Sequence, residues 1–259
     1  MQARRRAATR SNISPGAEKR EPEGAVALRS ALTAAPSFDL LGETGLTSRE
    51  IAIEELRQEL RKRVAGKRLL VAIAGAPGSG KSTLAESLIE SLNADSPDCA
   101  AVLPMDGFHY DDLYLTPAGL RPRKGAPDTF DVGGLRHTLL RLKSADEEHV
   151  AIAIFDRRLE IARAGARLIP QATRIIVAEG NYLLLRRKPW SDLSPLFDLT
   201  VLVETPEHVL RERLTARWRH YKLTPAQIAD KLDANDLPNG RLVSSESIDP
   251  DFRIRSTAT

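Results

Sequence analysis

The chain has a single cysteine and no long hydrophobic segment. Cys99 is the only cysteine among 259 residues, so a disulfide within the chain is excluded, and its place beside the apolar residues 100–103 predicts a small side chain in a strand. No apolar run approaches the roughly 18 residues of a membrane-spanning helix, and the start lacks the apolar core of a secretory signal. We therefore expect a soluble, cytoplasmic protein that does not act at a membrane.

Outside its first 20 residues the chain lacks a net positive charge. Residues 1–20 hold six Lys or Arg and one Glu, so this segment carries a charge of +5. The formal net charge of the whole chain is +3, which leaves −2 for the remaining residues. Nucleic-acid binding depends on clustered Lys and Arg side chains that neutralise phosphates. The sequence therefore argues against nucleic acid as a partner.

Residues 1–45 have no periodic pattern and are rich in Arg, Ala, Ser, Pro and Gly, which predicts a disordered basic tail. An Arg- and Ser-rich segment with few acidic residues also resembles an organelle transit peptide, so import into an organelle stays open as the alternative. An N-terminal helix is expected within 46–67. Residues 47–50 match a capping box, apolar residues recur at helical spacing over 53–64, and Gly66 follows.

A complete G-x-x-x-x-G-K-[ST] motif occupies residues 75–82, between the apolar run 69–74 and a helical stretch at 83–92. Glycines let the backbone point its N–H groups at a phosphate, and the helix that follows offers its positive end. Lys81 is expected to reach the β- and γ-phosphates, and Ser82 to bind Mg²⁺. An ordinary glycine-rich turn has no use for this lysine and hydroxyl. The predicted nucleotide-binding residues are Gly75, Ala76, Pro77, Gly78, Ser79, Gly80, Lys81, Ser82 and Thr83.

Further apolar runs alternate with helical segments along the chain. They lie at 100–104, 150–155, 174–178 and 199–203. This alternation predicts an α/β fold, a P-loop NTPase three-layer sandwich with a mainly parallel sheet and helices on both faces. We expect one such domain over residues 68–250, followed by a C-terminal tail at 251–259.

Acidic residues follow the ends of the predicted strands, where parallel sheets bind their ligands. Asp106 follows the second strand, so its carboxylate is a candidate general base for transfer of a phosphoryl group to an alcohol. The alternative is a turn-forming Asp-Gly pair. Glu179 ends the run 174–179 and is a candidate ligand of Mg²⁺, directly or through water; the alternative is a carboxylate paired with a structural arginine.

A candidate lid helix covers residues 210–218. Leu210, Leu214 and Trp218 form one apolar stripe, and Arg213 and Arg217 lie one turn apart on an adjoining face. Arginines that close over phosphates stabilise the charge of a transferring phosphoryl group. The alternative is a solvated charged face.

With these motifs in place, the chain resembles the phosphoribulokinase, uridine kinase and bacterial pantothenate kinase group of P-loop small-molecule kinases. Within the group it is most similar to the bacterial fructose transport system kinases. The resemblance covers roughly residues 68–245. Its markers are residues 75–82, 105–109, 123–131, 155–157, 179–184, the arginine-bearing lid and 235–239. The family pattern has a proline two residues before the Phe-Asp-Arg triplet, where this chain has Ala153.

The resemblance implies roles for individual residues. Asp106 would be the catalytic base, with Lys81, Arg213 and Arg217 also catalytic, and Ser82 and Glu179 would serve Mg²⁺. The acceptor pocket would be bordered by His109, Arg123, Lys124, Asp131, Asp156 and Arg157, and the segment 235–239, including Asn239, would lie near the adenine. Taken by itself, His109 could equally satisfy a local backbone group, and Arg123 and Lys124 could be solvated loop cations.

The predicted function is therefore that of an ATP-dependent kinase, with ATP and Mg²⁺ as cofactors and a small-molecule alcohol as the acceptor. The alternative is a non-enzymatic ATP-binding regulator or chaperone. A GTPase would need an Asn-Lys-x-Asp segment, and a transporter ATPase a Leu-Ser-Gly-Gly signature, and the sequence contains neither. The identity of the acceptor and the oligomeric state do not follow from the sequence.

Overall fold

The computed structural model describes residues 48–64 and 66–256. The chain divides into the units Met1–Thr44 and Gly45–Thr259, and every described residue belongs to the second. The predicted tail and Thr47 of the predicted capping box lie outside the described residues. Within them, no helix is both long and apolar enough to cross a membrane.

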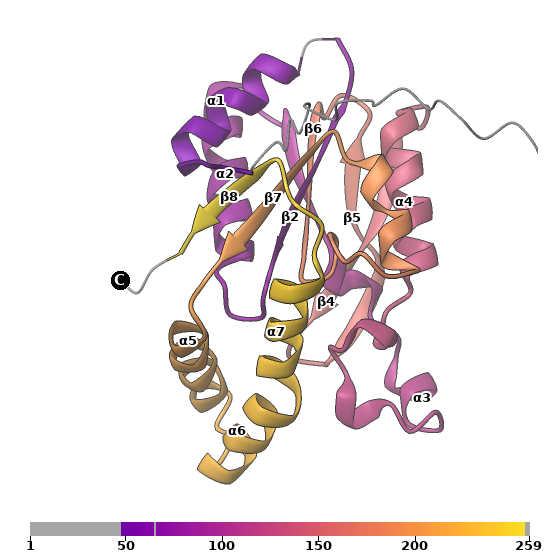
Figure 1. Cartoon of the computed structure of the whole chain (residues 1–259). Coiled ribbons are helices and arrows are strands. Elements are labelled where there is room, and N and C mark those ends of the chain that lie inside the picture. The colour runs from indigo at the N-terminus through magenta and orange to yellow at the C-terminus, as the bar shows by residue number, and fades with distance from the viewer. Residues whose placement is uncertain (1–47, 65, 257–259) are drawn as a thin grey trace, which may run out of the picture. The chain divides into compact units, whose positions relative to one another are not determined.

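A fully parallel six-stranded sheet forms the centre of the described unit (Figure 1). The strands along it are β1 (Arg49–Glu50), β8 (Phe252–Arg255), β7 (Leu199–Glu204), β2 (Leu69–Gly75), β6 (Ile175–Gly180) and β3 (Ala100–Pro104). Four of them were predicted as apolar runs, because strands buried on both faces are hydrophobic throughout. In β2 every residue is buried.

Helices cover both faces of the sheet. The side chains of β2 alternate between two cores: Val71 and Ile73 pack against α1 (Ile53–Arg63) and α2 (Lys81–Asp95), whereas Leu70 faces the opposite core. That second core contains α4 (Val132–Ser144) and α7 (Leu237–Glu246). The three-layer α/β sandwich predicted from the sequence is confirmed.

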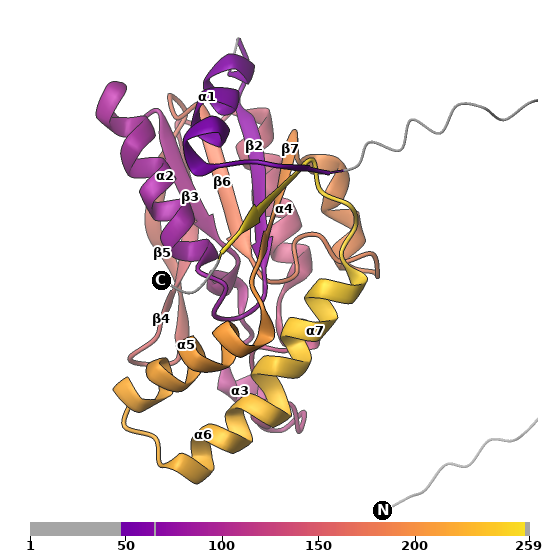
Figure 2. The same ribbon diagram turned by 60° about the vertical axis from the view of Figure 1, so that its left-hand side comes forward.

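A helical lid extends beyond the carboxyl ends of the strands (Figure 2). It comprises α5 (Glu207–His220), α6 (Pro225–Lys231) and a π-helical turn that leads into α7. Leu210 and Leu214 of α5 pack with Ala76 of the phosphate-binding loop in a separate small core, and Trp218 lies against it. The apolar stripe predicted for α5 thus fastens the lid to the loop. The remaining helices are α3 (Asp112–Leu115) and short 3₁₀ turns at Met105–Phe108, Arg121–Arg123, Pro127–Thr129, Trp190–Asp192 and Ser194–Leu196.

The run 150–155, predicted as a strand of the parallel sheet, belongs elsewhere. It lies in β4 (His149–Asp156), which pairs antiparallel with β5 (Ile161–Pro170) in a separate two-stranded sheet. The sequence offered no sign of β5, because most of its residues are exposed and it mixes Arg, Gly and Ala. The hairpin instead packs against the 3₁₀ turn that carries Asp106.

Both ends of the described unit also differ from prediction. Residues 49–50, assigned to a capping box, form β1, and the helix begins at Ile53, where the Glu55 side chain accepts a hydrogen bond from the Ala52 N–H at 3.4 Å. The predicted C-terminal tail contains β8, which lies between β1 and β7. Because β1 and β8 pair with each other, neither segment was recognisable alone.

Arg68, directly before β2, ties three parts of the fold together. Its buried guanidinium donates to the backbone carbonyls of Thr173 at 2.8 Å, Leu142 at 2.7 Å, Pro170 at 2.9 Å and Gln171 at 2.7 Å. These carbonyls lie at the end of α4 and in the connection from β5 to β6. The side chain therefore satisfies backbone carbonyls of two separate segments.

Candidate active site

The loop after β2 has the backbone of a phosphate-binding site. Gly78 and Gly80 adopt positive φ values of 81° and 88°, a region open to glycine, and α2 begins directly afterwards at Lys81. A Cβ atom at Gly75 would lie 2.7 Å from Ser79 Oγ, so the loop folds back tightly on itself. The positive end of α2 thus opens onto the loop, as anion binding requires.

Ser82 and Glu179 provide a pair of oxygen atoms beside this loop. The Ser82 hydroxyl donates to Glu179 Oε2 at 3.0 Å, and Glu179 is in register with Ile73 of the neighbouring strand β2. Magnesium prefers oxygen ligands and usually takes one or two from protein, with the rest from phosphates and water. The pair fits that donor set. Among the described residues, no group of three or more His, Cys, Asp or Glu side chains could hold a metal by itself.

Asp106 lies in the 3₁₀ turn directly after β3, and its Oδ2 accepts a hydrogen bond from Arg157 Nη2 at 2.6 Å. The next residue, Gly107, touches the hairpin: a Cβ there would lie 2.2 Å from the carbonyl oxygen of Ala153. Ala153 stands at an irregularity in the β4–β5 register, between Ile152 and Ile154. The hairpin therefore positions Asp106 both through its backbone and through Arg157.

The charges of this site oppose the effect of burial. Burial alone would raise the pKa of Asp106, but the positive charges of His109, Arg157 and Lys81 outweigh it and hold that pKa below its ordinary value. For Glu179, burial dominates and raises the pKa, although Lys81 acts in the opposite direction. Burial lowers the pKa of His109, although the Asp106 carboxylate acts in the opposite direction.

A cavity of about 120 Å³ joins the loop, the hairpin and the lid. Of the residues predicted to form the site, its wall contains Pro77, Lys81, Ser82, Asp106, His109, Lys124, Arg157, Arg217 and Asn239. The wall also contains Arg121, Asn181 and Lys231, which were not assigned to the site from the sequence, together with Asn235 and Asp236 of the segment expected near the adenine and the rings of Phe130, Phe155 and Trp218. Asn181 directly follows β6, two residues after Glu179, and this position at a strand end was the only feature of the sequence that could have placed it in the site.

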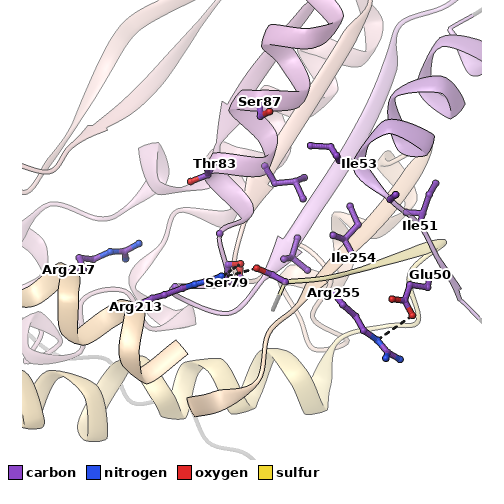
Figure 3. Close-up of a pocket in the computed structure, with 16 residues that line it drawn as sticks. Glu50, Ile51, Ile53, Ser79, Thr83, Ser87, Arg213, Arg217, Ile254 and Arg255 are labelled. Atoms are coloured by element: carbon purple, nitrogen blue, oxygen red, sulfur yellow. Dashed lines mark hydrogen bonds and ion pairs between the residues drawn. The ribbon is translucent and has the colours of Figure 1, made fainter. Parts of the chain in front are cut away.

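A larger groove of about 890 Å³ is lined by other residues of the same loop (Figure 3). Gly78, Ser79, Gly80 and Thr83 line it together with both lid arginines. Its far wall is built from residues 50–53 and 254–256, where Arg255 forms an ion pair with Glu50 at 3.3 Å. This groove is the candidate site for a nucleotide, with the phosphates at the loop.

The two lid arginines differ in position. Nη1 of Arg213 donates to the Ser79 carbonyl at 3.2 Å and to Ser256 Oγ at 3.0 Å, so this side chain holds the loop and the end of the chain together. Arg217 lines both the groove and the small cavity. Burial lowers the pKa of Arg217, and the neighbouring Arg157 acts in the same direction. Arg217 is therefore placed between the two candidate ligands.

Three residues predicted to border the acceptor lie outside the cavity wall. Asp131 caps α4 by accepting a hydrogen bond from the Gly134 N–H at 2.8 Å. Asp156 accepts from the backbone of the hairpin turn and pairs with Arg163 at 3.0 Å. Arg123 pairs with Asp128 at 3.3 Å on the surface. Asn239 departs from prediction in another way, since it lines the Asp106 cavity and not the larger groove.

His109 serves the local structure and also reaches the cavity. Its Nδ1 lies 2.8 Å from the Asp106 carbonyl oxygen. Its ring lies between Phe130 and Phe155, with centroid distances of 4.0 and 4.7 Å. His109 therefore contacts a local backbone carbonyl and also lines the cavity, so both of the roles considered from the sequence have a basis in the structure.

Comparison with known proteins places the chain in a family. No family model matches it. It is 33% identical over 197 residues to a Schizosaccharomyces pombe protein provisionally named uridine kinase C227.14, covering 73% of this chain and 83% of that protein. A crystal structure of a provisionally named fructose transport system kinase from Silicibacter has 39% identity and a TM-score of 0.73, covering 78% of this chain and 98% of the other. A pantothenate kinase from Myxococcus xanthus is 30% identical over 173 residues, covering 62% of this chain and 52% of that enzyme. The chain belongs to the family of P-loop kinases that includes the uridine kinases and the bacterial pantothenate kinases.

Proposed function

We propose that this protein transfers the γ-phosphoryl group of ATP to a hydroxyl group of a small molecule. One observation carries the proposal: Asp106 and Lys81 line the same cavity, together with Ser82 and Arg217. A carboxylate beside phosphate-binding cations is the arrangement that phosphoryl transfer to an alcohol requires. A module that only binds ATP has no need of a base at this position.

The residues of the chain divide the reaction between them. The acceptor hydroxyl would donate a hydrogen bond to Asp106, whose carboxylate takes the proton. As the new bond forms between the acceptor oxygen and the γ-phosphorus, the bond from that phosphorus to the oxygen of the leaving ADP breaks. Lys81 and Arg217 would stabilise the charge on the transferring group, because a cation fixed in a buried site acts strongly on developing charge. Ser82 and Glu179 would hold Mg²⁺, which when bound neutralises and orients the phosphates.

The acceptor would occupy the cavity bordered by His109, Lys124 and Arg157. Relatives named as uridine kinase and pantothenate kinase support a small hydroxyl compound, such as a nucleoside, a sugar or a pantothenate-like alcohol. The small volume of the cavity, about 120 Å³ before any ligand enters, supports the same conclusion. A macromolecular hydroxyl would need a wider opening.

The test is acceptor-dependent formation of ADP by the full chain with Mg²⁺. The acceptors are uridine, pantothenate, D-glycerate, ribose and ribose 5-phosphate. We expect one class to stimulate ADP formation, and Lys81→Ala to abolish it through loss of the phosphate contact. Tight ATP binding with no stimulation by any of them would favour the alternative function, a nucleotide-dependent regulator.

A further inference from the structure

The ion pair between Arg157 and Asp106 has a consequence for the acceptor. Arg157 reaches the base from the turn of the β4–β5 hairpin, at 2.6 Å, and lines the cavity that the acceptor would enter. With only about 120 Å³ open, a small molecule that reaches Asp106 has to share or displace the guanidinium. A displaced Arg157, whose side chain is 52% exposed, loses its ion pair with the base, and an anionic group on the entering molecule would replace that ion pair.

Two of the carboxylates near that turn, Asp112 and Asp156, are already paired with other cations. Asp112 accepts from Lys124 Nζ at 2.8 Å and from Arg121 Nε at 2.5 Å, so one carboxylate serves two cations. The side chain of Asp156, the nearest acid along the chain, pairs with Arg163 on the other side of the hairpin. Of the carboxylates that line the cavity, Glu160 is exposed in the same hairpin turn, three residues from Arg157, and is the acid with which an entering anion would compete for the displaced guanidinium.

Lys124 adds a second donor to the same place. Its side chain is only 6% exposed, and its ammonium donates to Asp112 and, at 2.6 Å, to the backbone carbonyl of Glu160 in the hairpin turn. Those contacts use two of its three N–H donors within the described residues, and Lys124 lines the cavity. Cationic side chains outnumber carboxylates in the cavity wall by six to three. The cations are Lys81, Arg121, Lys124, Arg157, Arg217 and Lys231, and the carboxylates are Asp106, Glu160 and Asp236.

We propose that the acceptor is an anionic hydroxyl compound, whose carboxylate or phosphate takes Arg157 from Asp106 and is held by Arg157 and Lys124. The inference rests on the kinase function proposed above. A neutral nucleoside or sugar offers the displaced guanidinium no negative charge, so Arg157 would turn to water or to Glu160 and would not hold the acceptor. An anionic acceptor compensates that charge and frees the base in one event. Arg157 is thereby the residue that selects the acceptor by charge.

The experiment compares matched pairs of charged and neutral compounds on the full chain. The pairs are pantothenate and pantothenyl alcohol, D-glycerate and glycerol, and ribose 5-phosphate and ribose, which separate carboxylate from phosphate. Binding is measured calorimetrically with the nucleotide site saturated by a non-hydrolysable ATP analogue and Mg²⁺, and ADP formation is measured with ATP. We expect the charged member of one pair to bind and react at least about tenfold better, since hydrogen bonds to charged groups contribute that much.

The variants assign the preference to a residue. Arg157→Gln should abolish the advantage of the charged compound by raising its KM, and Arg157→Lys, which keeps the charge, should retain part of it. Arg158→Gln is the matched control, because it removes the same charge from the same turn at a residue outside the cavity wall. It should leave the preference unchanged.

The outcomes separate the two proposals. Equal or better binding of the neutral compounds, a preference that survives Arg157→Gln, or an equal loss for both members of a pair overturns the anion site. Failure of every charged compound to bind the nucleotide-saturated protein also overturns it. Turnover of a neutral acceptor leaves the kinase function intact. Binding of an anion through Arg157 without any ADP formation contradicts the kinase function and leaves the anion site standing.

Discussion

Arg157 Nη2 lies 2.6 Å from Asp106 Oδ2, and the two residues follow strands of different sheets. Asp106 follows the edge strand of the parallel sheet, whereas Arg157 belongs to the turn of the antiparallel hairpin. The candidate base is thus held by an element that the central sheet does not determine. Any movement of the hairpin changes the charge and the geometry at the base.

The pH dependence of catalysis should depend on the ion pair between Arg157 and Asp106. The pKa of Asp106 lies below its ordinary value of 3.8 because cations including Arg157 outweigh burial, so the carboxylate stays ionised throughout the range from neutral to mildly acidic pH. Arg157→Gln removes a charge that favours ionisation, which raises this pKa. The acid limb of kcat/KM against pH, which reports the free enzyme where Arg157 contacts Asp106, should therefore move to higher pH in the variant. The Arg158→Gln profile should coincide with wild type, and an unmoved limb in Arg157→Gln would count against the assignment.

Gly107→Ala should impair catalysis without a change of chemistry. The new Cβ would lie 2.2 Å from the Ala153 carbonyl, a backbone atom that cannot rotate away, so the turn that carries Asp106 must shift. A shift of about 1 Å at a reacting group can lower the rate about 10²-fold. We expect kcat to fall by that order. Gly133→Ala, where the added Cβ makes an ordinary contact of 3.5 Å, should retain full activity, and equal rates in both variants would contradict the prediction.

Arg68→Met should destabilise the fold. The variant removes four hydrogen bonds from a charged donor, two of them buried, which should lower the free energy of unfolding by about 3 kcal/mol. Urea denaturation should show a lower midpoint at an unchanged slope. Arg63→Met, which removes a surface ion pair with Glu59, is the control and should have a midpoint close to that of wild type. A midpoint for Arg68→Met equal to that of the control would show that the four bonds contribute little.

Glu179→Gln should weaken the response to magnesium. Chelation of the metal should abolish ADP formation in wild type, and the Mg²⁺ concentration for half-maximal rate should rise about tenfold or more in the variant, because a ligand oxygen or its support is lost. ATP affinity measured without metal should change little. An unchanged magnesium midpoint would exclude Glu179 from the metal site.

The sequence predicted the parts of the fold that repeat a simple physical pattern. Buried parallel strands are apolar throughout, and the P-loop places glycine, lysine and hydroxyl at fixed spacing, so β2, its loop and the acid at the end of β6 were found. The strand β5 was not, because an exposed strand with Arg and Gly lacks that pattern.

The directions in which individual side chains point could not be predicted from the sequence either. Asp131 was predicted to border the acceptor and instead caps a helix, because an aspartate before a helix serves either purpose. Asp156 and Arg157 are neighbours in sequence, yet their side chains serve opposite sides of the hairpin. The irregularity at Ala153 and the antiparallel pairing decide this, and neither can be read from one segment alone.

The most direct measurement of the central proposal compares wild type with Asp106→Asn in acceptor-dependent ADP formation, at saturating ATP and Mg²⁺. If Asp106 is the general base, the variant binds ATP like wild type and its turnover falls by about 10² to 10⁴-fold, the range for loss of a general base. Asp128→Asn, which removes a surface carboxylate paired with Arg123, should retain full activity. Full turnover by Asp106→Asn would contradict the account, because the cavity would then hold a ligand without performing the chemistry assigned to its carboxylate.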